Sequence, residues 1–153
     1  KELYIKIIAV GKLKHKTFLS LAQDYLARLS HWSVEIIEVK ESKINEVDRK
    51  LEAEAEGIEK HLDSQYFNVL MDADGEIVSS EKFAKFVESK KNYGKKICFV
   101  IGGSHGLPTS FKAKFDKVLS FGRMTFTHQF ARVMLLEQIY RASAIIEGRS
   151  YHY

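Results

Sequence analysis

The sequence predicts an α/β fold in which helices cover both faces of a mainly parallel sheet. Short apolar runs, typical of buried strands, alternate along the chain with longer segments whose apolar residues repeat at helical spacing. The chain has 153 residues, of which 45% are hydrophobic, so it can bury the core of one domain. No break in composition marks a second domain, and we expect residues 1–153 to form a single one.

Five segments are predicted to be strands. The fourth begins at Ile97 and is almost wholly apolar, which is the pattern of a strand buried on both faces. The third is expected to end at Met71, because residues 72–75 have the composition of a turn. The predicted strands are residues 3–10, 34–39, 66–71, 97–101 and 118–121.

Helices are expected between these strands and after the last of them. Residues 43–62 carry apolar residues on one stripe, so the acids Glu52, Glu54 and Glu56 are interpreted as a solvent-exposed face. Pro108 suits the first turn of a short helix. The predicted helices are residues 17–29, 43–62, 80–92, 108–114 and 129–147.

Three glycines, Gly102, Gly103 and Gly106, follow the fourth predicted strand. Glycine leaves backbone N–H and C=O groups uncovered, and parallel sheets bind ligands at the carboxyl ends of their strands. The glycines therefore indicate a site for a flat polar ligand, with a nucleotide-like cofactor as the first hypothesis. The dinucleotide fingerprint is absent because Ile101 precedes Gly102. Glycines are also typical of simple turns.

Four segments together carry a family resemblance. They are AVGKLK (residues 9–14), VIGGSHGLP (100–108), LSFGRMTFTHQFARVMLLEQIYRA (119–142) and SYHY (150–153). In order, spacing and chain length, the sequence resembles the RlmH (YbeA-type) family of SPOUT-class RNA methyltransferases from end to end. The resemblance implies an S-adenosylmethionine-dependent enzyme that methylates N3 of a pseudouridine in bacterial 23S ribosomal RNA. It also implies a C-terminal trefoil knot and a homodimer.

The resemblance places cofactor contacts at strand ends and in one loop. Met71 stands where the family usually has Leu, and Thr127 stands where it usually has Pro. Without the resemblance, Met71 and Met124 are equally typical of core residues. The implied contacts with S-adenosylmethionine are Met71, Gly103, Gly122, Arg123, Met124, Thr125, Phe126 and Thr127.

Three residues are candidates for catalysis: His128, Arg132 and His152. An imide N–H is a poor nucleophile until it loses its proton, so an enzyme must orient it, accept the proton or stabilise the anion. His128 lies beside the cofactor loop, Arg132 follows one helical turn later, and His152 lies in the C-terminal motif. The sequence does not identify the proton acceptor, and a histidine in a loop is also typical of a solvent-facing residue.

The positive charges are clustered, although the formal net charge of +4 alone is too small to indicate a nucleic-acid partner. Lysines crowd the first loop, whereas residues 35–63 are rich in acids. An RNA phosphate backbone, within the ribosome as the family implies, suits the basic rim. The expected RNA contacts are Lys12, Lys14, Lys16, Arg132, Tyr151 and His152, while Tyr153 stands where the family commonly has Lys or Arg.

The remaining features concern compartment and assembly. The one cysteine, Cys98, lies in a predicted strand and indicates a buried thiol rather than a disulfide or a metal cluster. No signal peptide or membrane-spanning run is evident, so we expect a cytoplasmic protein without membrane or metal partners. Residues 129–147 are apolar over so wide an arc that part of this helix is expected to pack on a second copy of the chain.

Two other functions fit some of these features. A non-catalytic RNA-binding module would explain the basic loop without a cofactor. A small-molecule-binding α/β protein would explain the glycines without RNA. Titration with S-adenosylmethionine and an RNA gel shift distinguish these functions from a methyltransferase.

Overall fold

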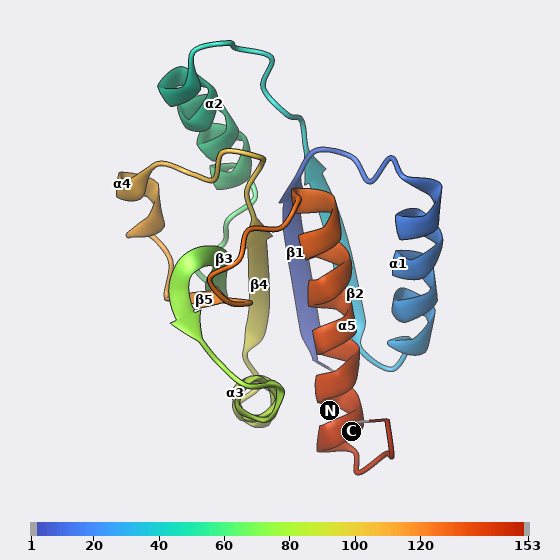
Figure 1. The fold of residues 1–153 in the computed structure, drawn as a ribbon. Helices are drawn as coiled ribbons and strands as arrows, with labels where there is room; N and C mark the ends of the chain where they lie inside the picture. The colour runs from blue at the N-terminus through green and yellow to red at the C-terminus, as the bar shows by residue number, and fades with distance from the viewer. Residues whose placement is uncertain (1–2, 152–153) are drawn as a thin grey trace.

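The computed structural model describes residues 3–151, which form one five-stranded sheet (Figure 1). Neighbouring strands are parallel throughout, and their order is β2-β1-β4-β3-β5. The strands are β1 (Tyr4–Val10), β2 (Ser33–Val39), β3 (Tyr66–Ile77), β4 (Lys96–Ile101) and β5 (Lys117–Ser120). The predicted α/β fold with a mainly parallel sheet is confirmed.

Helices cover both faces of the sheet. Helices α1, α3 and α5 pack on one face, and α2 and α4 pack on the other (Figure 1). Helix α2 begins later than predicted, because the carboxylate of Glu46 accepts a hydrogen bond from the backbone N–H of Arg49 and caps the helix there. The helices are α1 (Lys16–Arg28), α2 (Val47–Glu59), α3 (Ser80–Asn92), α4 (Thr109–Lys112) and α5 (His128–Ile146).

Strand β4 lies at the centre of the sheet and contributes to both cores. Ile97 and Phe99 belong to the core beneath α1, α3 and α5, whereas Cys98 and Val100 belong to the core beneath α2 and α4. The alternation follows from the two-residue period of a strand. Burial raises the pKa of the Cys98 thiol to about 12, so the thiol stays protonated and serves as a small core residue, as predicted.

Strand β3 does not end at Met71, so the predicted turn at residues 72–75 is wrong. The strand continues to Ile77, with a change of register against β5 just after Met71. A Cβ atom added to Gly75 would lie 2.8 Å from the backbone of Leu119, so glycine is what allows β5 to approach so closely. Residues 72–75 are an irregular stretch of the strand.

Helix α5 is covered mostly by its own chain. Leu135, Leu136 and Ile139 are fully buried, and the helix packs against α1, α3 and β4. Most of its wide apolar arc is therefore covered within the chain, and the packing of part of it on a second copy stays a prediction. Phe130 at the start of the helix stays 40% exposed. Neither α5 nor any other helix within residues 3–151 is both long and apolar enough to cross a membrane.

Candidate active site

A cavity of about 160 Å³ lies at the carboxyl ends of β4 and β5, beside residues 70–73 of β3. Parallel strands end at the same edge of a sheet, so the loops that follow them meet there. The glycine segment after β4, the loop after β5 and the first turn of α5 form the walls. The cavity is lined by Leu70, Met71, Asp72, Ala73, Ile101, Gly102, Gly103, Ser104, Gly106, Leu107, Phe121, Gly122, Met124, Thr125, Phe126, His128 and Ala131.

Most of the predicted cofactor residues line this cavity, but Arg123 and Thr127 do not. The guanidinium of Arg123 donates hydrogen bonds to the carbonyl oxygens of Ala73 and Gly75. The hydroxyl of Thr127 accepts a hydrogen bond of 3.2 Å from the backbone N–H of Phe130 and so caps α5. Both residues shape the loop between β5 and α5, because each fixes one end of it.

Several cavity residues were not singled out from the sequence. Ile101 ends β4, Leu70 lies within β3 just before its change of register, and Ala131 lies in the first turn of α5. Leu70 and Ile101 stand at the ends of predicted strands, which was an available signal. Apolar residues at these positions are equally typical of the core, so the sequence alone did not separate the two roles.

Glu54 lies beneath the glycine segment and is only 1% exposed, so its predicted place on a solvent-exposed face is wrong. Its Oε2 atom accepts a hydrogen bond of 3.0 Å from the backbone N–H of Ser42 and lies 3.5 Å from the Nζ of Lys50. Its Oε1 atom has no hydrogen-bond partner among the described residues. A Cβ atom on Gly103 would lie 2.8 Å from this Oε1, so a side chain at this position would require the Glu54 carboxylate to shift. Glu52 and Glu56 are exposed, as predicted.

His128 lines the cavity at the start of α5. Both ring nitrogens are buried, and neither has a hydrogen-bond partner within residues 3–151. Burial lowers the pKa of His128; the nearby Arg132 also lowers it, against the opposing effects of Glu41 and Glu54. The imidazole is therefore neutral near pH 7 and has a nitrogen free to accept a proton.

Arg132 lies one turn further along α5 and is 3% exposed. Its guanidinium donates to Oε2 of Glu38 at 2.6 Å and to the carbonyl oxygen of Gly11 at 2.8 Å. Burial acts to raise the pKa of Glu38, but hydrogen bonds from Arg132 and the Leu13 N–H outweigh it, and the pKa is lowered. Arg132 thus keeps its charge inside the chain, in contrast to the expected RNA contact.

The loop between β1 and α1, together with the first residue of α1, presents the lysines that were expected to contact RNA. Lys12, Lys14 and Lys16 are exposed. The backbone of the loop is fixed, because the N–H groups of Lys14 and His15 donate to Oε1 of Gln129 on α5, at 3.0 and 3.3 Å. A fixed backbone with exposed lysine side chains suits a charged surface that binds a partner without reordering.

Tyr151 packs back on α5, although it was expected to contact RNA. Its hydroxyl donates to Oε2 of Glu137 at 3.1 Å, and its ring meets Tyr140 edge-on at 4.8 Å between centroids. Arg141 donates to the same carboxylate oxygen and lies over the Tyr151 ring. Tyr151 is therefore held by its own chain, and His152 and Tyr153 lie outside the described residues.

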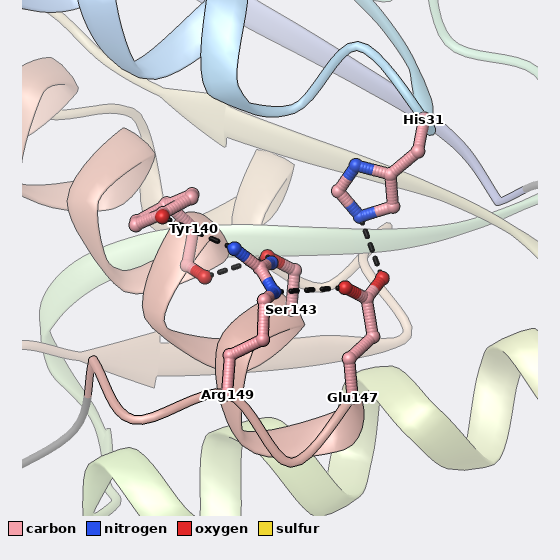
Figure 2. A network of polar contacts seen from close by, with 5 residues as sticks. All are labelled: His31, Tyr140, Ser143, Glu147 and Arg149. Atoms are coloured by element: carbon pink, nitrogen blue, oxygen red, sulfur yellow. Dashed lines mark hydrogen bonds and ion pairs between the residues drawn. The ribbon is translucent and has the colours of Figure 1, made fainter.

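The carboxyl end of α5 is fixed by Arg149 (Figure 2). Its guanidinium donates to the Tyr140 hydroxyl at 3.1 Å, to the Ser143 hydroxyl at 2.9 Å and to Oε1 of Glu147 at 2.9 Å. The other carboxylate oxygen of Glu147 lies 2.8 Å from Nε2 of His31. This network ties the start of the C-terminal segment to α5 and to the loop before β2.

Comparison with known proteins identifies the family. A family model described as a predicted SPOUT methyltransferase matches residues 3–152. The chain belongs to the SPOUT methyltransferase family. A curated relative named ribosomal RNA large subunit methyltransferase H, from Caldicellulosiruptor saccharolyticus, is 42% identical over 97% of this chain and 99% of its own length. A relative of the same name from Malacoplasma penetrans is 41% identical over 97% of this chain and 98% of its own.

Solved structures share the SPOUT fold. A probable methylase family protein from Haemophilus influenzae has a TM-score of 0.57 at 17% identity and covers 97% of this chain and 70% of its own. The SpoU methyltransferase AviRb from Streptomyces viridochromogenes, solved with AdoMet, has a TM-score of 0.50 at 14% identity. The match covers 94% of this chain and 59% of the AviRb chain. At these identities the likeness concerns the fold alone, and the trefoil knot stays a prediction implied by the family.

Proposed function

We propose that this chain is an S-adenosylmethionine-dependent methyltransferase that acts on large-subunit ribosomal RNA, with N3 of a pseudouridine as the methylated atom. The observation that carries the proposal is the match, over 97% of this chain, to relatives named ribosomal RNA large subunit methyltransferase H. The cavity at the strand ends supports it, because ligands of open α/β sheets bind at that edge. The ribosome is the proposed substrate particle, and the cytoplasm is the proposed compartment.

The residues of the cavity fit the adenosyl part of this cofactor. Leu70, Ile101 and Leu107 provide an apolar wall that suits a flat ring. The glycines at positions 102 and 122 carry no side chain, so their backbone groups stay open to the polar edge of a ligand. When bound, the cofactor supplies a methyl group on a positively charged sulfur. Within residues 3–151 no three His, Cys, Asp or Glu side chains are placed to hold a metal ion.

His128 is the proposed proton acceptor for the imide N–H of the base. It lines the cavity, its nitrogens lack partners among the described residues, and burial keeps it neutral. Arg132 does not reach the surface, so its proposed role is that of a positioning residue. It holds the backbone of Gly11 beside the His128 ring and helps to keep the pKa of His128 low.

Methyl transfer to ribosomes from a bacterial strain that lacks the modification tests this proposal, with the product mapped by mass spectrometry. We expect His128→Asn to lower kcat by about 10²-fold or more, without a change in calorimetric affinity for S-adenosylmethionine. His31→Asn is the matched control, because His31 lies at the other end of α5. Equal activity of the two variants would remove His128 from the chemistry.

The same experiment separates the alternative functions. An RNA gel shift without heat from S-adenosylmethionine would support a non-catalytic RNA-binding module. Heat without a gel shift would support a small-molecule-binding protein. If the protein binds both S-adenosylmethionine and RNA but the ribosomes remain unmethylated after the assay, the ribosome is excluded as the substrate.

A homodimer is part of the proposal. Large apolar side chains are exposed on the packed helices α1 and α5: Leu21 is 39% and Phe130 40% exposed. Leu21 and Phe130 also line a hollow of about 370 Å³. Such an apolar patch suits the self-complementary surface of a two-fold dimer. The proposed catalytic role of His152 belongs to this assembly and stays a prediction.

Light scattering tests the dimer. We expect the native protein to have the mass of a dimer and Phe130→Glu to give a monomer. Tyr93→Glu is the control, because Tyr93 is 79% exposed and lies at the end of α3, away from this patch. A monomer mass for the native protein at micromolar concentration would contradict the proposed homodimer.

A further inference from the structure

A further hollow lies beside the cavity. A groove of about 530 Å³ is formed by the loop after β1 and the loop after β2. Its lining includes Lys12 and Lys14 from the first loop and Lys40 and Lys43 from the second, and all of these lysines are exposed. Lys40 and Lys43 belong to a segment in which the sequence showed mainly acids, so they were not expected to face the same groove as the first loop.

The acids of this groove already have cationic partners. Glu38 accepts a hydrogen bond of 2.6 Å from the buried Arg132. Glu41 lies 3.6 Å from the Nζ of Lys50, which it shares with the buried Glu54. The groove lysines, in contrast, form no ion pair with another residue of the described chain. The groove therefore presents positive charge that its own acids leave largely uncompensated.

Gly11 joins this groove to the cavity. It lines the groove, and a Cβ atom added to it would lie 3.5 Å from Nε2 of His128, which lines the cavity. The position has a φ of +89°, a conformation that favours glycine. With no side chain at position 11, one end of the groove is directly beside the His128 ring.

We propose that this groove binds the phosphate backbone of a single-stranded segment of the RNA substrate, with Lys40 and Lys43 as phosphate contacts opposite Lys12 and Lys14. The inference rests on the proposed function and adds to it the path of the substrate. Lysine is a hydrated point charge that binds phosphates without fixed geometry. A nucleotide at the Gly11 end of the groove has its base within reach of the cavity once it is unstacked, which favours a single strand over a duplex.

The test compares two double variants that remove the same charge. Lys40→Gln with Lys43→Gln changes the groove, whereas Lys85→Gln with Lys95→Gln changes exposed lysines on α3 and in the loop before β4. A short fluorescein-labelled oligouridine is titrated with each protein over a range of salt concentrations. We expect the groove variant to bind on the order of tenfold more weakly, with a salt slope reduced by about 0.7 for each lysine lost, the value for a phosphate contact on a single strand. The control variant should match the wild type.

Other outcomes would overturn the inference. Equal weakening of both variants would indicate net charge alone, and no weakening of either would exclude the groove. Loss of binding to ribosomes with unchanged binding to oligouridine would indicate an acidic protein segment as the occupant. Calorimetry with S-adenosylmethionine checks that each variant is folded. A different result would contradict the proposed function and not the groove: the wild-type protein binds oligouridine through the groove but transfers no methyl group to ribosomes.

Discussion

The arginines of the C-terminal third and the lysines of the groove carry the same charge but do different work. Each of these arginines is bonded within the chain: Arg123 to the carbonyl oxygens of Ala73 and Gly75, Arg132 to Glu38 and Gly11, Arg141 to Glu137, and Arg149 to three side chains. The groove lysines are exposed and have no such partners within residues 3–151. A count of positive charges along the sequence therefore mixes residues that hold the fold with residues that face a partner.

The difference follows from the chemistry of the two side chains. A guanidinium is planar, presents several N–H donors in a fixed fork and is weakly hydrated, so it can bridge a carboxylate and a carbonyl inside a protein. An ammonium is compact and strongly hydrated, and it stays at the surface where a mobile polyanion can reach it. On this basis, a basic rim for RNA is to be sought among the lysines of this chain.

The largest expected effect is that of Arg132→Ala. The substitution leaves the Gly11 carbonyl without a donor and removes the cation beside Glu38. We expect a loss of about 3 kcal/mol in the free energy of unfolding, the low end for a buried pair because Glu38 is partly exposed. Urea denaturation followed by circular dichroism measures it.

Lys14→Ala is the control for this prediction. Lys14 is exposed, so its removal should change the free energy of unfolding by less than about 0.5 kcal/mol. If Arg132→Ala is as stable as the wild type but binds RNA more weakly, Arg132 contacts RNA as the groove lysines are proposed to do. The distinction between fold-stabilising arginines and RNA-binding lysines would then be wrong.

A smaller effect is expected at Arg149. Arg149→Ala removes the donor that joins Tyr140, Ser143 and Glu147 (Figure 2). We expect a loss of about 1 kcal/mol, because the arginine is partly exposed and water replaces some of the bonds. Thermal unfolding measures it, with Arg49→Ala, an exposed arginine on α2, as the control. If the two variants melt together, the network in Figure 2 does not stabilise the chain.

The sequence predicted the helices and strands better than it predicted which residues contact one another. Helix α3 lies at Ser80–Asn92, as predicted, because apolar spacing, the cap at Ser79 and the glycine at position 94 are all local signals. The strand after Met71 was mispredicted, since its continuation depends on contact with β5, which is distant in the sequence. Local patterns therefore located the edge of the sheet where the cavity lies, and long-range contacts decided the details.

The candidate site shows the same limit. Residues such as Gly122 and His128 were predicted from motifs and do line the cavity. Glu54 was assigned to the solvent, because helical periodicity does not reveal that the backbone N–H of Ser42 and the Nζ of Lys50 surround its carboxylate. The sequence shows a positively charged residue at position 132, but it does not show which groups Arg132 pairs with. The pairing of a charge is a tertiary property, and only the structure supplies it.

The pH dependence of stability tests the same ion pair through Glu38, the acidic partner of Arg132. The pKa of Glu38 is lowered from its usual 4.5 in the folded chain. A lowered carboxyl pKa contributes stability above that value, and the contribution is lost as the pH falls through the folded-state pKa. We expect the stability difference between wild type and Glu38→Gln to be full near pH 7 and to shrink below about pH 4.5. Denaturation midpoints from pH 7 to pH 3 measure it, and a difference that is constant with pH would contradict the ion pair.

The smallest expected effect is that of replacing groove lysines by arginine, and the reverse exchange at Arg132 is its counterpart. Lys12→Arg combined with Lys14→Arg keeps charge at exposed positions, so the free energy of unfolding should stay within about 0.5 kcal/mol. Affinity for oligouridine should stay within about twofold, since phosphates accept either cation. Arg132→Lys should lose most of the stability lost in Arg132→Ala, because one ammonium cannot reproduce the fork that joins Glu38 to Gly11. Urea denaturation and fluorescence anisotropy on the same samples measure both quantities. If Arg132→Lys is as stable as the wild type, charge alone is sufficient at that position and the geometric distinction between the two regions is wrong.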